Sequence, residues 1–147
     1  MKKLFYIFIL LFIVGWAQAQ QRVVYTINDG WKFTKGSPFE AQLTGCDDSS
    51  WETVNIPHTW NDKDADDETP GFYRGPVWYR KQLFIDKSQE GRRAMIYFEG
   101  ANQEVRFYLN GQFVGEHKGG YTRFCFDITP HLRYGQENLF AIYVNNV

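Results

Sequence analysis

Residues 104–117 restrict the fold of this chain more than any other segment. Apolar residues alternate with polar or amphipathic ones at its start, and this period of two predicts a strand with one buried face. The apolar positions of that strand are Val105, Phe107 and Leu109. Asn110-Gly111 follows, a pair suited to a type I′ turn because both central residues of that turn have positive φ. Residues 112–117 then return, so the sequence predicts a β-hairpin.

The rest of the chain shows short apolar, β-branched or aromatic runs separated by turn residues. The strands expected outside the hairpin are residues 22–27, 31–34, 51–56, 77–85, 94–98, 124–127 and 139–144. The one helical signal is residues 129–134, with Thr129 as the expected N-cap and Pro130 at the first helical position. About nine short strands with almost no helix predict an all-β sandwich or barrel, with antiparallel sheets.

The first nineteen residues have the pattern of a secretory signal peptide. Lys2 and Lys3 precede an apolar run over residues 4–14, and Ala17-Gln18-Ala19 is a small-x-small cleavage site. A membrane anchor is the alternative, but the apolar run is short for a bilayer. We expect a mature chain that begins near Gln20 and is exported to the periplasm or the extracellular space, with no membrane anchor.

Charge and cysteine content exclude some functions. The chain has 17 acidic residues against 16 basic ones, of which two lie in the leader. It therefore offers no electrostatic footprint for nucleic acid. Residues 20–147 suffice for one domain. For Cys46 and Cys125 we expect two buried thiols, because free cysteine is among the most buried residue types, while export would also allow a disulfide. Their spacing does not indicate a metal site.

Four motifs occur in a fixed order along the mature chain. They are WETVNIPHTW (51–60), YRGPVWYRK (73–81), FEGANQEVRFYLNGQFVGEHKGGYTRFCFDIT (98–129), and a closing pattern of Gly135, Asn138, Val144 and Asn146. In this order they resemble the amino-terminal sugar-binding domain of glycoside hydrolase family 2, the β-galactosidase and β-glucuronidase group. The resemblance covers nearly all of residues 31–147.

The resemblance implies a jelly-roll β-sandwich that buttresses a catalytic barrel and walls its sugar pocket. The motif wording is most like β-galactosidase, while β-glucuronidase stays open because specificity resides largely in the barrel. The implied partners are a carbohydrate, a β-galactoside or related glycan, and the downstream domains of the same enzyme. The two catalytic glutamates of the family lie on that barrel. We therefore assign no catalytic residue and no cofactor to this chain and expect it to be inactive alone.

The acidic run NDKDADDE, residues 61–68, is a candidate loop for two roles. Family loops at this place reach toward the substrate pocket, so Asp67 and Glu68 are implied as substrate-adjacent residues. The run also resembles the start of an EF-hand, but Asp67 replaces the required glycine and Tyr73 stands at the twelfth position, which excludes a true EF-hand. A looser Ca²⁺ site over Asp62–Glu68 and a solvated acidic loop remain as alternatives.

Several aromatic and basic residues have two interpretations. Trp78 and Tyr79 could stack on a sugar ring, although strand aromatics usually belong to the core. We expect His58, set among tryptophans, to be structural. Arg80 and Arg74 are expected to pair with acids of the 62–68 loop. The rival functions are a free-standing carbohydrate-binding module with Trp78, Tyr79 or Tyr121 as its platform, and a structural assembly domain that binds no sugar.

Overall fold

The computed structural model describes residues 22–38, 40–61 and 72–147, and it is built almost entirely from strands. The strands are β1 (Trp31–Lys35), β2 (Glu52–Val54), β3 (Pro76–Ile85), β4 (Met95–Phe98), β5 (Glu104–Leu109), β6 (Gln112–Lys118), β7 (Phe124–Asp127) and β8 (Gln136–Asn145). Two 3₁₀ turns, η1 (Lys87–Gln89) and η2 (Thr129–His131), complete the described elements. The predicted signal peptide, residues 1–19, and the acidic run Asp62–Glu68 lie outside the described residues.

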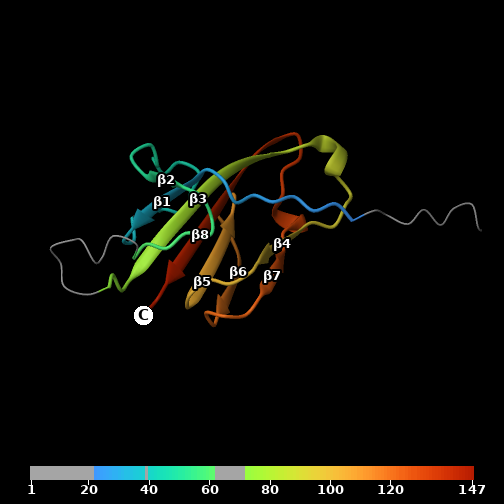
Figure 1. Ribbon diagram of the computed structural model, residues 1–147. Coiled ribbons are helices and arrows are strands. Elements are labelled where there is room, and N and C mark those ends of the chain that lie inside the picture. Colours follow the sequence, from blue (N-terminus) through green and yellow to red (C-terminus); the bar gives the residue numbers. More distant parts are fainter. Residues whose placement is uncertain (1–21, 39, 62–71) are drawn as a thin grey trace, which may run out of the picture.

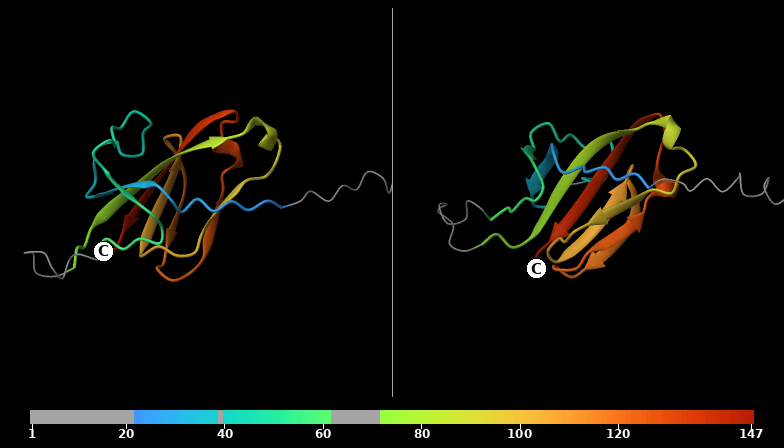
Figure 2. Two further views of the ribbon diagram at one scale, coloured as in Figure 1. Left: turned by 45° about the horizontal axis from the view of Figure 1, so that its top comes forward. Right: turned by 45° about the vertical axis from the view of Figure 1, so that its right-hand side comes forward.

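The strands form two antiparallel sheets. A six-stranded sheet has the order β2-β1-β3-β8-β5-β6, and β4 pairs with β7 in a second sheet (Figure 1). The small sheet packs against one face of the large sheet (Figure 2). This arrangement confirms the predicted all-β sandwich with antiparallel sheets. In the described part of the chain, no helix is long and apolar enough to cross a membrane.

The main core lies between the two sheets and follows from the period-two alternation. Its buried members include Val77 and Tyr79 of β3, Val105 and Phe107 of β5, Ile142 of β8 and Ile96 of β4. Phe107 stacks on Phe126 of β7 with ring centroids 6.0 Å apart. Gly115 allows this approach, because a Cβ at that position would lie 2.6 Å from the Phe126 ring. Part of the contact between the two sheets is therefore the packing of Phe126 of β7 against Phe107 of β5 and over Gly115 of β6.

A second cluster lies on the opposite face of the large sheet, beneath residues 40–51. Trp78, Ala141 and Ala41 are its buried members. Beside them Arg80 is 1% exposed and bonds to Asp48 Oδ2 at 2.8 Å. Its guanidinium also donates to the carbonyls of Ala41, Leu43 and Cys46. The rigid fork of donors on Arg80 thus matches the carboxylate and carbonyls of the 41–48 loop. The expected pairing of Arg80 and Arg74 with acids of residues 62–68 lies outside the described residues.

The predicted hairpin is confirmed as β5 and β6. Leu109 lies opposite Gln112, and the two turn residues between them have φ values of 54° (Asn110) and 83° (Gly111). The Asn110 side chain accepts a hydrogen bond from the Leu139 amide at 3.0 Å and donates to Asn138 Oδ1 at 2.9 Å. Because Asn138 is fully buried, this contact fastens the turn to β8.

Residues 22–27 and the segment after β7 differ from the sequence-based expectations. The former form no strand in the structure. Their β-branched composition favours a strand, but a ladder needs a neighbouring backbone. The expected helix at 129–134 is only the short turn η2, and Ile128 is its N-cap. The Thr129 hydroxyl is not the cap, because it accepts a hydrogen bond from the Ala94 amide at 2.9 Å.

The two cysteines are unpaired in the structure. Cys46 is half-buried, but Cys125 is exposed, so the expectation of two buried thiols is wrong for Cys125. Cys125 lies opposite Tyr97, which is also exposed, on the outer face of the small sheet. Successive side chains of a strand point to opposite faces, and the neighbours Phe124 and Phe126 take the inner one.

Candidate functional site

Five segments meet at one end of the large sheet, which we call the loop edge. The strand register places Pro76 opposite Asn145, Asn145 opposite Glu104, and Glu104 opposite Lys118. β3 and β5 therefore begin where β6 and β8 end, beside the C-terminal residue in Figure 1. The loop edge comprises residues 35–36, 72–76, 99–104, 118–123 and 145–147. Loops that a rigid sheet gathers at one end are common places for binding residues.

A hydrogen-bonded brace joins the start of β3 to the end of β8. Asn146 Oδ1 accepts from the Gly75 amide at 2.8 Å, and Asn146 Nδ2 donates to the Tyr73 carbonyl at 3.0 Å. The Tyr73 hydroxyl donates to the Pro76 carbonyl at 2.8 Å. Gly75 has φ of 149°, and a Cβ there would meet the Tyr73 hydroxyl at 3.0 Å. The glycine is therefore needed for this close approach.

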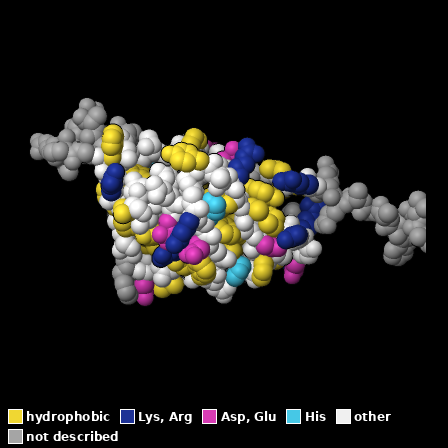
Figure 3. All heavy atoms as spheres, turned by 90° about the horizontal axis from the view of Figure 1, so that it is seen from below, with side chains coloured by type: hydrophobic (Ala, Val, Ile, Leu, Met, Phe, Trp, Pro, Cys, Tyr) yellow, Lys and Arg dark blue, Asp and Glu magenta, His cyan; other side chains and the backbone are white. Residues whose placement is uncertain are grey.

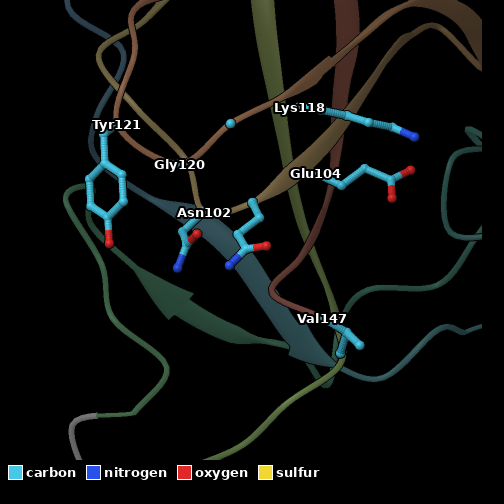
Figure 4. A pocket seen from close by; sticks show the side chains of 8 residues that line it. Asn102, Glu104, Lys118, Gly120, Tyr121 and Val147 are labelled. Carbon is cyan, nitrogen blue, oxygen red and sulfur yellow. The ribbon is translucent and has the colours of Figure 1, made fainter.

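A polar hollow of about 340 Å³ opens at the loop edge. Its lining residues are Asn102, Gln103, Glu104, Lys118, Gly119, Gly120, Tyr121 and Val147. Figure 4 shows Tyr121 and Asn102 next to each other, with their polar ends pointing the same way, and Glu104 and Lys118 side by side across the hollow. The volume lies near the lower end of the roughly 300–1,000 Å³ range of small-molecule sites.

The charges beside the hollow include both signs. Arg106 Nη2 lies 2.6 Å from Glu104 Oε1, and Arg106 Nε lies 3.9 Å from Glu116 Oε2. The Arg106 guanidinium also lies over the Tyr143 ring, 5.3 Å from its centroid. Partial burial lowers the pKa of Arg106. The bonded Glu104 carboxylate and the nearby Tyr143 and Tyr108 together raise it by more, so the pKa lies above its ordinary value. Arg106 is therefore a fixed cation behind the hollow.

Trp78 and Tyr79 lie in the core in the structure. This is the second of the two interpretations given for them above, and the first was stacking on a sugar ring. Trp78 is 5% exposed and packs against Tyr143 and Tyr108, with centroids 5.4 and 5.8 Å away. Tyr79 faces the other way, and its hydroxyl lies 2.9 Å from His58 Nδ1. Burial raises the pKa of Tyr79. In this chain neither ring presents an open face, and His58 has the structural contact expected of it.

The other predicted site residues fall into two groups. Asp67, Glu68 and the Ca²⁺ alternative over Asp62–Glu68 lie outside the described residues. Tyr121, named as a platform of the rival module, does line the hollow. Asn102 and Gly120 were not among the predicted site residues. A usable signal was the Gly119-Gly120 pair, since paired glycines at a strand end mark a close backbone or side-chain approach. Among the described residues, no three His, Cys, Asp or Glu side chains gather to hold a metal ion.

Residues 15–146 match the protein family described as glycosyl hydrolases family 2, sugar binding domain. The chain belongs to this family. The match covers both sheets and all of the loop edge except Val147. It confirms the resemblance drawn from the four motifs and identifies the chain as the amino-terminal sugar-binding domain of that family.

The relatives carry the names of two kinds of glycosidase. A β-glucuronidase of Formosa agariphila is 40% identical over 136 residues, which are 87% of this chain and 14% of that protein. A β-galactosidase of Thermoanaerobacter pseudethanolicus is 38% identical over 126 residues, 85% of this chain and 17% of that protein. The crystal structure of Bacteroides uniformis β-glucuronidase superimposes with a TM-score of 0.78 at 41% identity, over 84% of this chain and 14% of that one. The chain thus spans about a sixth or less of the length of these relatives.

Proposed function

We propose that this chain is the amino-terminal domain of an exported family 2 β-glycosidase, in which it supports the catalytic barrel and forms one wall of the sugar pocket. Family membership carries this proposal. The loop edge supports the wall role, because the brace of Tyr73, Gly75 and Asn146 holds its segments in one arrangement. The leader pattern of residues 1–19 supports export.

Two substrate classes are candidates for the whole enzyme. The β-glucuronidase relatives support a β-glucuronide, with identities of 40% and 41% for the two described above. The β-galactosidase at 38% identity supports the β-galactoside that the motif wording predicted. We take the β-glucuronide as the first substrate to test and the β-galactoside as the second. Either bond would be cleaved by the paired carboxylates of a barrel, held roughly 5 Å apart.

The experiment is to express the gene product that carries this chain and to assay it on chromogenic β-glucuronide and β-galactoside. Hydrolysis of one of them supports the enzyme. Gly75→Val tests the wall role, because the added side chain must displace Tyr73 and loosen the loop edge. A misplacement of about 1 Å can cost roughly 100-fold in rate, so kcat/KM should fall at least tenfold. Tyr97→Ala, on the outer face of the small sheet, is the matched control and should leave kcat/KM unchanged.

The free-standing carbohydrate-binding module is the second candidate, and the exposure of Tyr121 favours it. This ring is 95% exposed at the edge of the hollow, as a stacking platform requires. A gene product that binds a glycan but hydrolyses neither chromogenic substrate would support the module. A gene product that hydrolyses one of them would exclude it.

A further inference from the structure

Four side chains around the hollow make no contribution to the fold through polar contacts. In the described part of the chain, Asn102, Gln103, Lys118 and Tyr121 have no side-chain hydrogen bond or ion pair. By contrast, the neighbouring amide side chain of Asn146 uses both its oxygen and its nitrogen in the brace. Four unused polar groups around one hollow are available to a ligand.

The backbone beneath these side chains is held firmly. The Gln103 amide donates to the Asn145 carbonyl at 2.8 Å, and the Gly119 amide donates to the Gln103 carbonyl at 2.7 Å. Gly120 has no side chain, and a Cβ there would lie 2.6 Å from Asn102 Oδ1. The Asn102 amide can therefore rest against the Gly120 backbone. A site whose groups project from fixed backbone loses less entropy on binding.

The chemistry of the hollow suits a sugar unit without net charge. A sugar hydroxyl both donates and accepts, and the hollow offers amides, a carboxylate, an ammonium group and a phenol, which together do both. The exposed Tyr121 ring offers a flat apolar face with a polar tip. Two cations, Arg106 and Lys118, offset the carboxylates of Glu104 and Glu116. The surface seen from below likewise places acidic and basic side chains next to each other (Figure 3).

We propose that this hollow is a carbohydrate subsite that binds one uncharged sugar unit of a glycan. Tyr121 stacks on the sugar ring, and Asn102, Glu104 and Lys118 bind its hydroxyls. The inference deepens the proposed function, on which it rests for the class of ligand, and assigns the sugar-binding role to named residues. It needs no catalytic barrel, because every group is on this chain.

The test is a titration of the ¹⁵N-labelled chain with lactose as the neutral probe and glucuronate as the charged probe. Lactose at millimolar concentration should shift the amide signals of residues 102–104 and 118–121. Tyr121→Ala and Asn102→Ala should each weaken lactose binding by roughly tenfold, the scale of one lost stacking or hydrogen-bonding partner. Tyr97→Ala removes another exposed tyrosine, which lies on the outer face of the small sheet and does not line the hollow, and this variant should bind lactose as the unsubstituted chain does.

Three results would overturn the inference. They are lactose signals that leave residues 102–104 and 118–121 unmoved, equal binding by the Tyr121→Ala and Tyr97→Ala variants, and tighter binding of glucuronate than of lactose. Ligand-observed NMR on the full gene product gives the same comparison if the chain needs its neighbours to fold. The titration does not read hydrolysis, so a gene product without glycosidase activity would defeat the proposed function and leave this result standing.

Discussion

Arg80 and Arg93 each pair with an aspartate, but in different surroundings. Arg80 Nε lies 2.8 Å from Asp48 with its side chain 2% exposed, and Arg93 Nε lies 2.9 Å from Asp127 with its side chain 75% exposed. Exposed pairs add little stability because water screens them, whereas removing one partner of a buried pair leaves polar groups unsatisfied. The two pairs have nearly equal distances, so burial and not distance decides which of them contributes more to stability.

Arg80→Met should destabilise the protein by about 3 kcal/mol or more, because three carbonyls of the 41–48 loop lose their donor. Chemical denaturation measures the change. Arg93→Met is the matched control and should unfold close to the unsubstituted protein. Equal midpoints for the two variants would show that the 41–48 loop does not depend on Arg80.

Asp127 should contribute stability that is lost in acid. The hydroxyl and amide of Thr129, and then the Arg93 guanidinium, lower the pKa of Asp127 from its ordinary value of 3.8. A pKa that is lower in the folded state gives stability that is present above pH 3.8 and is lost as the pH falls through the lowered value. Asp127→Asn should therefore flatten the loss of stability below that pH. The measurement is the denaturation midpoint of both proteins at several pH values in the acid range. Midpoints that fall equally with pH in the two proteins would contradict this prediction.

At the scale of elements, the β5–β6 hairpin depends on its turn. Gly111 has φ of 83°, which costs a β-branched residue about 1–3 kcal/mol. Gly111→Val should therefore lower the melting temperature. Gly45→Val is the matched control, because Gly45 lacks positive φ and an added Cβ there meets nothing within 4 Å. Equal melting temperatures for the Gly111→Val and Gly45→Val variants would mean that the turn does not require glycine at position 111.

The elements also show where local sequence is insufficient. Residues 104–118 formed the predicted hairpin because the alternation and the turn residues agree within one short segment. Residues 22–27 have strand composition but no partner, and pairing is a property of the neighbouring backbone. Thr129 looked like a cap, but the amide of Ala94, the residue before β4, uses its hydroxyl.

At the scale of the whole molecule, we expect this chain alone to hydrolyse no glycoside. It has 17 carboxylate side chains, so the argument rests on placement rather than number. Hydrolysis needs two carboxyl groups at a set separation around the sugar, and the family resemblance implies that both lie on a catalytic barrel. The purified chain is to be assayed on chromogenic β-galactoside, β-glucuronide and β-mannoside. Turnover above the buffer blank that a carboxylate substitution abolishes would place the chemistry in this domain.

The leader gives a second prediction at this scale. The mature chain should begin near Gln20, because the basic residues, the apolar run and Ala17-Gln18-Ala19 have the pattern of a cleavable signal. Mass spectrometry of the exported product measures the first residue. An exported product that retains residues 1–19 would refute the cleavage.

The sequence by itself determined most of the strand pattern, the hairpin, the sandwich class and the family, because alternation, turn residues and motifs are local and ordered along the chain. Tertiary structure alone decided which aromatic rings are buried. Trp78 and Tyr79 are consecutive and both lie in cores, on opposite faces of one strand, since elements far away in sequence cover each face. The hollow, too, required the fold, because Asn102, Tyr121 and Val147 become neighbours only when β5, β6 and β8 reach the same end of the sheet.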